Sequence, residues 1–153
     1  MILSENLTKN NIIIKAKAKS RWELIKEMVD LAVKNKELNP DDKDSINNSL
    51  LEREKSMSTG IGNGVAIPHC TTDKINDIII IFALNQKGID FDSIDNQPVK
   101  ITILLIVPKN KFSQHIKTLA NIAKMMSDDD IREKLLSLKT TESIIKTLKN
   151  YKK

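Results

Sequence analysis

The stretch VKITILLIV, residues 99–107, decides how this chain folds, because nearly all of its residues are apolar and most are β-branched. A second run, IIIIFAL at residues 78–84, has the same character. Strands that are apolar on both sides usually lie between layers of helices. The two runs therefore predict central strands of a sheet that is covered on both faces.

Before these runs, the patterns predict one strand and two helices. Residues 11–18 alternate apolar side chains with lysines, which is typical of a strand with one solvated face. Ser20 and Glu23 have the spacing of a capping box, and the apolar residues that follow predict a helix over 21–35. An Asn-Pro start followed by acidic residues predicts a second helix over 40–54.

Around and after the runs, a short apolar strand is expected at 65–67, and helical spacing predicts helices over 113–127, 129–138 and 141–150. In the first of these helices, Ile116 belongs to the stripe expected to face the core. The resulting order is β-α-α-β-β-β-α-α-α. It predicts an α/β (α+β) fold, a mixed β-sheet flanked by helices on both faces.

Length and composition limit the class of protein. A chain of 153 residues with 40% hydrophobic and 29% charged residues is expected to form one domain over residues 1–153. No apolar run is long enough for a membrane-spanning helix, and no basic leader precedes an apolar stretch at the start. The single cysteine excludes a disulfide framework. We therefore expect a cytoplasmic protein without direct membrane insertion.

The net charge of +5 leaves three possibilities open: nucleic acid, an acidic partner, or simply a lysine-rich surface. The positive charges are scattered, and aromatic residues make up only 3% of the chain. Proteins that bind single strands need aromatic platforms on which bases stack. We therefore expect no nucleic-acid partner.

A cluster of glycines marks the most unusual segment, STGIGNG at residues 58–64. The simplest interpretation is a turn that needs positive φ. The order of elements and the glycine spacing fit neither a P-loop nor a dinucleotide fingerprint. Glycines also let an anion approach backbone N–H groups closely. The candidate phosphate-binding residues are Ser58, Thr59, Gly60, Gly62 and Gly64.

Two further residues near this segment suit phosphate chemistry. His69, one of two histidines, follows Pro68. Proline fixes its own φ and keeps the residue before it extended, so the backbone that leads to His69 is expected to be rigid. Arg53 precedes the glycines and has the side chain suited to bidentate phosphate contact. The alternatives are a structural histidine and a charged run, residues 52–55, that is only a solvated helix end.

The second histidine, His115, falls in the first turn of the helix expected at 113–127. The helix dipole there disfavours an imidazolium and attracts an anion, so a neutral, hydrogen-bond-donating His115 suits a phosphoryl group. A surface histidine is the alternative. Two histidines and scattered carboxylates give no metal-ligand set, so we expect neither a metal nor a cofactor.

The stretch REKSMSTGIGNGVAIPH, residues 53–69, closely resembles the active-site motif of the enzyme IIA domain, fructose/mannitol type, of the bacterial phosphoenolpyruvate-dependent sugar phosphotransferase system. The resemblance continues through GIDFD at 88–92, QPV at 97–99 and LLIVP at 104–108. It then reaches His115 with Leu-Ala at 119–120. It therefore covers nearly the whole chain.

This resemblance implies a phosphotransferase of the phosphocarrier kind. His69 would accept a phosphoryl group from the phosphohistidine of the carrier HPr and pass it to a IIB domain of a sugar permease. Phosphoryl transfer depends on positioning and on positive donors around the equatorial oxygens. Arg53 would neutralise those oxygens, and His115 would donate a hydrogen bond to them. The second ring nitrogen of His69 is expected to donate to a carbonyl that fixes the tautomer.

One residue departs from the family pattern, and two alternative functions stay open. Cys70 stands where a glycine commonly follows the active histidine, and we expect it to be buried and inert. The nitrogen-related IIA proteins share the motif, and there phosphorylation of His69 would control binding to regulatory proteins. A binding module that has lost transfer and uses its basic surface is the third possibility.

Overall fold

The two apolar runs form the centre of the sheet. A computed structural model describes residues 2–151, and in it β5 (Ile79–Ile89) and β6 (Val99–Pro108) pair antiparallel, with Phe82 opposite Ile103. Nearly all of β6 is buried, as expected for a strand covered on both faces. These two strands are the frame on which the remaining elements are placed.

Four shorter strands complete the sheet, in the order β1-β5-β6-β3-β2, with β4 also paired to β6. Strand β1 (Ile12–Ile13) is parallel to β5. Strands β3 (Val65–Ala66) and β4 (His69–Thr72) both run parallel to β6, one after the other along it. Strand β2 (Gly60–Gly62) is antiparallel to β3. The sheet is therefore mixed, as the sequence predicts.

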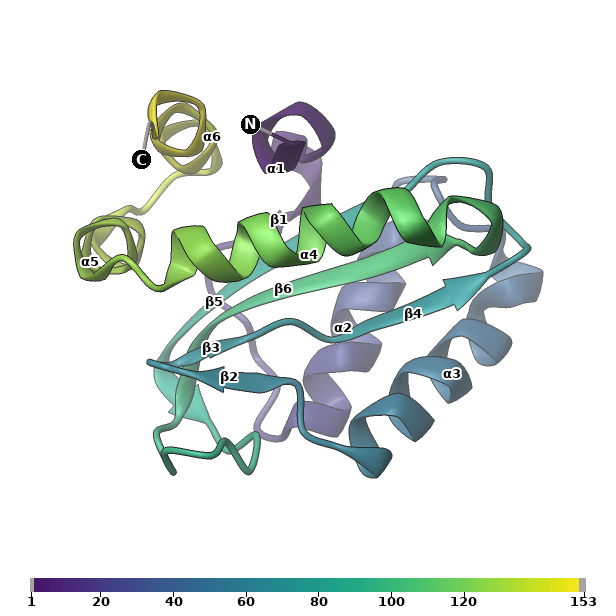
Figure 1. The fold of residues 1–153 in the computed structure, drawn as a ribbon, viewed down its shortest axis with the longest axis horizontal. Coiled ribbons are helices and arrows are strands. Elements are labelled where there is room, and N and C mark those ends of the chain that lie inside the picture. The colour runs from purple at the N-terminus through teal and green to yellow at the C-terminus, as the bar shows by residue number, and fades with distance from the viewer. Residues whose placement is uncertain (1, 152–153) are drawn as a thin grey trace.

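Helices cover both faces of this sheet (Figure 1). One layer consists of α1 (Ile2–Asn6), α4 (Phe112–Met126), α5 (Asp129–Ser137) and α6 (Thr141–Asn150). The other layer consists of α2 (Arg21–Lys34) and α3 (Lys43–Ser56). Consecutive residues of β6 belong to the two different cores: Leu105 packs with the first layer and Leu104 with the second.

The predicted helices are confirmed to within a few residues. Ser20 caps α2 by accepting a hydrogen bond from the backbone N–H of Glu23 at 3.1 Å. Short 3₁₀ helices precede three of the elements, at Lys9–Asn11, Pro40–Asp42 and Lys109–Lys111. Elements α1, β2 and β4 are additional to the predicted order. No helix among residues 2–151 has both the length and the apolar character to cross a membrane.

Two expectations are wrong in detail. The strand expected over residues 11–18 is limited to Ile12–Ile13. Beyond it, Ala16 N–H still donates to the carbonyl of Leu84 on β5 at 3.0 Å, and Ala18 N–H donates instead to the Glu27 carboxylate at 3.1 Å. Ile116 was expected to face the core, but it is 49% exposed. The buried stripe of α4 passes through Thr118, Ile122 and Met125 instead.

Candidate functional site

His69 lies next to a break between two strands, β3 and β4, that both pair with β6. Strand β3 ends at Ala66 and β4 starts at His69, and between them the carbonyl of Pro68 accepts a hydrogen bond from Leu105 N–H at 2.9 Å. Proline fixes its own φ and keeps Ile67 extended. His69 is therefore the first residue of β4. Its backbone is held by β6, where Leu105 is its register partner.

The hydrogen bond of the imidazole determines which nitrogen of His69 is free. Nδ1 lies 2.8 Å from the carbonyl oxygen of Ile67. A carbonyl only accepts, so Nδ1 carries the proton and Nε2 of the neutral ring keeps its lone pair. The half-buried position lowers the pKa of His69, and the positive charge of Arg53 lowers it further, whereas the bond to Ile67 acts in the opposite direction. The neutral ring is therefore favoured.

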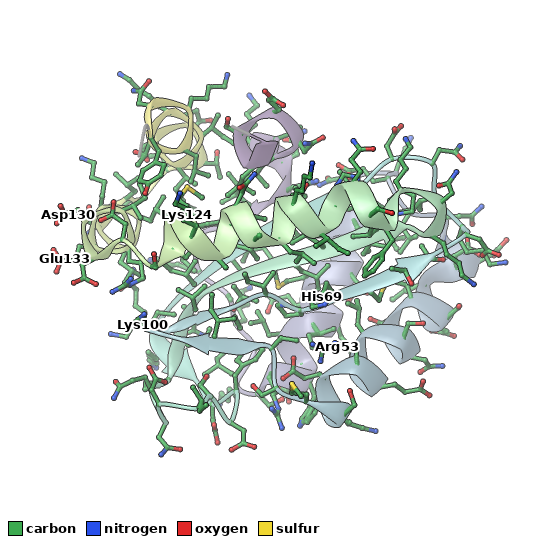
Figure 2. All side chains as sticks on the ribbon, in the orientation of Figure 1. Arg53, His69, Lys100, Lys124, Asp130 and Glu133 are labelled. Carbon is green, nitrogen blue, oxygen red and sulfur yellow. The ribbon has the colours of Figure 1, made fainter. Side chains whose placement is uncertain are left out.

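Arg53 and His69 lie in the same surface pocket. Figure 2 shows Arg53 on α3 beside His69 on β4. The pocket has a volume of about 510 Å³, and its lining consists of Ser49, Glu52, Arg53, His69, Cys70, Thr71 and Phe112. The structure thus brings together two of the three residues that the sequence singled out for catalysis, with α3, β4 and the start of α4 forming the walls.

Arg53 is held by the turn that ends its own helix. Its Nη1 donates to the carbonyl of Met57 at 2.8 Å, just past the last residue of α3. This bond occupies one of the guanidinium donors, and a guanidinium has five. Arg53 can therefore bind a phosphoryl oxygen while it stays anchored.

His115 lies in the first turn of α4 but is not in the lining of that pocket as the described residues form it. It is 6% exposed, and its Nδ1 lies 3.1 Å from the hydroxyl of Thr118. Burial lowers the pKa of His115, and the nearby Lys111 lowers it further. The ring is therefore neutral near pH 7, as the helix position suggested, and it is not a surface histidine.

The glycine cluster forms a β-hairpin rather than an open loop. Gly62 pairs with Val65 across Asn63 and Gly64, whose φ angles are +59° and +77°. Positive φ at both central residues is what a type I′ turn requires. Gly60 lies so close to Ser93 that a Cβ there would come within 2.1 Å of the Ser93 hydroxyl.

Several polar groups of this segment already have partners within the protein. The Ser58 hydroxyl donates to the carbonyl of Phe91 and accepts from Gly60 N–H at 3.0 Å. The Thr59 hydroxyl donates to Glu54. Among the described residues, none of the segment 58–64 lines the pocket of His69. Phosphate contact by Ser58, Thr59, Gly60, Gly62 and Gly64 stays a prediction.

One buried carboxylate near the site, that of Glu54, was not identified from the sequence. The charged run 52–55 has the character of a solvated helix end, but Glu54 within it is only 1% exposed. Its Oε2 lies 3.2 Å from Nη1 of Arg21, a residue 33 positions earlier. Helical spacing offers a signal in retrospect: Glu54 lies four residues after the buried Leu50 and hence on the same face of α3.

The thiol of Cys70, next to His69, is expected to have low reactivity. Cys70 is buried, as expected, and burial raises its pKa to about 12. The thiol therefore stays protonated at physiological pH, and the thiolate that would react is scarce. In the part of the chain that the structure describes, no group of three His, Cys, Asp or Glu side chains is arranged to hold a metal ion.

Known proteins resemble this chain in sequence. A model of the family described as phosphoenolpyruvate-dependent sugar phosphotransferase system, EIIA 2, matches residues 5–151. A nitrogen regulatory protein of Bradyrhizobium diazoefficiens is 34% identical over 148 residues, which is 97% of this chain and 95% of that protein. A fructose-specific EIIA component of Haloferax volcanii is 36% identical over 104 residues, 68% of each chain.

Solved structures resemble it in fold. The nitrogen regulatory protein IIA-Ntr from Neisseria meningitidis superposes with a TM-score of 0.88 at 28% identity, covering 97% of this chain and 99% of the other. The mannitol IIA of Escherichia coli has the same fold, with a TM-score of 0.79 at 22% identity over 93% and 98% of the two chains. The chain belongs to the EIIA 2 family of the phosphoenolpyruvate-dependent sugar phosphotransferase system, a family of phosphotransfer proteins.

Proposed function

We propose that residues 1–153 act as one cytoplasmic IIA-type phosphocarrier domain, which accepts a phosphoryl group from phospho-HPr on His69 and passes it to a IIB domain of a fructose/mannitol-type permease. The observation that carries this proposal is the hydrogen bond from His69 Nδ1 to the carbonyl of Ile67 at 2.8 Å. It leaves the lone pair of Nε2 available beside Arg53. Nε2 is therefore the atom that becomes phosphorylated.

The transfer balances without a metal or nucleotide. The Nε2 lone pair attacks phosphorus while the N–P bond to the donor histidine breaks, and the donor nitrogen keeps that electron pair, so the donor ring, protonated on its other nitrogen, leaves as a neutral imidazole. The phosphorylated ring of His69 carries a positive charge, which its Nδ1–H shares with the Ile67 carbonyl. The ring thus stays in one orientation while it gives the group up again to the IIB domain.

Arg53 and His115 have different parts in this proposal. Arg53 lines the pocket and neutralises the charge on the equatorial oxygens, where a loose transition state concentrates it. His115 is neutral and buried at the start of α4, so it donates a hydrogen bond to the phosphoryl group without adding a charge. This role requires the tautomer in which Nδ1 accepts from the Thr118 hydroxyl and Nε2 carries the proton.

Exposed apolar side chains next to the site support docking of protein partners. Phe112, which lines the pocket, is 43% exposed, and Met57, to which Arg53 is bonded, is 69% exposed. Large exposed apolar side chains around a reactive group are typical of a protein interface. A structure of similar fold, 21% identical, is that of mannitol IIA from Escherichia coli in complex with phosphorylated mannitol IIB.

A phosphoryl chase tests this function. The chain is phosphorylated through HPr, freed of the donor and mixed with a fructose-type IIB domain, and both masses are followed. We expect the phosphoryl increment to leave the chain and appear on the IIB domain, and His69→Gln to give no transfer. A phosphorylated chain that keeps the group in the presence of several such IIB domains would contradict a role in sugar transport.

The similarity to nitrogen regulatory proteins favours one second candidate. The relative from Bradyrhizobium diazoefficiens matches 97% of the chain. In that case the phosphorylation state of His69 controls binding to regulatory target proteins. Capture from the source lysate by the phosphorylated and the unphosphorylated chain separates the two roles: a regulatory protein retained by one form only supports regulation, and a IIB domain supports transport.

A further inference from the structure

Glu54 is a buried carboxylate to which the phosphotransfer chemistry gives no role. It is 1% exposed, and both of its oxygens are engaged. Oε2 accepts from Arg21 at 3.2 Å and from the backbone N–H of Thr59 at 3.1 Å, and Oε1 accepts from the Thr59 hydroxyl. A charge in a protein interior is costly unless it is paired and fully hydrogen-bonded. Here two of the three bonds come from Thr59, in the segment that follows α3, and the third comes from Arg21 on α2.

From Thr59, backbone hydrogen bonds continue to the ring of His69. The carbonyl of Thr59 accepts from Ile67 N–H at 3.0 Å. The carbonyl of the same Ile67 accepts from Nδ1 of His69 at 2.8 Å. Ile67 is therefore held on its amide side by Thr59, and it holds the imidazole on its carbonyl side. Any displacement of Thr59 moves the acceptor that sets the His69 tautomer.

The same segment also anchors Arg53. Arg21 makes a second bond, to the carbonyl of Phe91 at 2.8 Å, and the Ser58 hydroxyl donates to that carbonyl as well. Residues 57–59 are thus tied to Arg21 through two acceptors, Glu54 and Phe91. Arg53 in turn donates to the carbonyl of Met57 at 2.8 Å. Arg53 and His69, two of the three groups proposed to contact the phosphoryl group, are therefore both attached to this one segment.

We propose that Arg21, Glu54 and Thr59 are positioning residues for phosphoryl transfer: the Arg21–Glu54 ion pair holds residues 57–59 in place, and this segment fixes both the orientation of the His69 ring and the placement of Arg53. The inference rests on the proposed phosphocarrier function. Such fixation matters because a shift of about 1 Å in a reacting group can reduce a rate by roughly 10²-fold.

The charge of Glu54 predicts a direction for the pKa change of His69 that a purely structural role would not produce. The carboxylate raises the pKa of His69, although burial, the largest influence, keeps that pKa below its ordinary value. Removal of the charge should lower the pKa of His69 further. A general loosening of the fold would instead expose the ring and return its pKa toward the ordinary value.

The test compares Glu54→Gln and Thr59→Val with Thr59→Ser, which keeps the hydroxyl. A matched control is Glu133→Gln, an exposed glutamate on α5, far from His69 in Figure 2. Imidazole nitrogen shifts of the unphosphorylated protein report the tautomer and pKa of His69 by NMR, and single-turnover phosphorylation by phospho-HPr reports the rate. The NMR readout needs no phosphorylation, so it tests positioning even if the proposed function fails.

We expect Glu54→Gln to lower the pKa of His69, to reduce the share of the Nδ1–H tautomer and to slow phosphorylation by roughly 10²-fold. Thr59→Val should have a smaller effect in the same direction, and Thr59→Ser should restore most of the rate. An unchanged tautomer and rate in folded Glu54→Gln would overturn the proposal. If that variant does not fold, equal rates for Thr59→Val and Thr59→Ser would do so.

Discussion

At His69, two groups determine how the imidazole reacts: the carbonyl of Ile67 selects the nitrogen that is free, and Arg53 adds positive charge beside it. The first fixes geometry, and the second disfavours an imidazolium; in the proposed function the same charge would attract the phosphoryl oxygens. Because these effects come from different residues, they can be removed separately.

Arg53→Gln should slow phosphorylation of His69 by about 10²-fold, because it removes the charge that stabilises the equatorial oxygens. The fold should change little, since Arg53 is partly exposed and its side chain donates to the carbonyl of Met57 at the helix end. Single-turnover rates and thermal unfolding measure the two effects. Lys55→Ala, an exposed basic residue of the same helix, is the control. A wild-type rate for Arg53→Gln would rule out its role.

The same substitution should raise the pKa of His69. The Arg53 charge holds that pKa down, in addition to the larger influence of burial, so its removal makes protonation easier. The neutral, reactive ring would then predominate only at higher pH, and the pH–rate profile of phosphorylation should shift upward. An NMR titration of the imidazole measures the change directly. An unchanged or lower pKa in Arg53→Gln would show that the two charges do not interact.

Single residues were predictable where the signal is local. Arg53 and His69 belong to one continuous motif, so the sequence alone singles them out as candidates, and the fold brings them to one pocket. Glu54 was not recognised, because its burial depends on Arg21, which lies 33 positions away. Nothing in the residues 52–55 themselves distinguishes a carboxylate that faces solvent from one that faces a partner of opposite charge.

Among the elements, the β2–β3 hairpin depends on backbone conformations that few residues adopt. Gly64 has a φ of +77°, and a Cβ there would lie 3.3 Å from the carbonyl oxygen of Pro98. Asn63, also at positive φ, is one of the residues that tolerate this region. The turn thus connects β2, at the edge of the sheet, to β3, the strand that leads to His69.

Gly64→Ala should therefore destabilise the protein by about 1 kcal/mol, which corresponds to a decrease in Tm of roughly 2–4 °C for a chain of this size. Gly64→Asn should cost less, since asparagine populates the left-handed region more readily. Thermal unfolding followed by circular dichroism measures both. A Gly64→Ala variant as stable as the wild type would mean that the turn relaxes to another conformation.

The long elements were predictable, and among the short ones β3 was predicted but α1, β2 and β4 were not. Ten or more residues of consistent pattern specify β6 or α4, whereas β2 and β4, with three and four residues, have too few positions to carry a period. The exposure of Ile116 has a different cause. Periodicity identifies an apolar residue but not whether the protein covers it, and Phe112 beside it is exposed as well.

At the scale of the molecule, the sheet separates two hydrophobic cores. Leu104 and Leu105 are adjacent on β6 and are both fully buried, yet each belongs to a different core. The double-sided burial was predictable from the apolar runs. The pairing of β3 and β4 along one side of β6 was not, because register depends on contacts between segments far apart in the chain.

Leu104→Ala and Leu105→Ala should each reduce the free energy of unfolding by about 2 to 5 kcal/mol, because each leaves a cavity in a packed interior. Lys124→Ala, an exposed residue of α4, should change it by less than about 0.5 kcal/mol. Urea unfolding measures all three. If either leucine variant behaved like the lysine variant, one face of the sheet would be open to solvent.

The central claim is that His69 accepts a phosphoryl group, and intact mass after incubation with phosphoenolpyruvate, enzyme I and HPr tests it most directly. We predict one acid-labile phosphoryl increment on the wild-type chain and none on His69→Ala. HPr from the same organism excludes a mismatched donor. No increment on the folded wild-type chain while that HPr is itself phosphorylated, or an equal increment on His69→Ala, would contradict the claim.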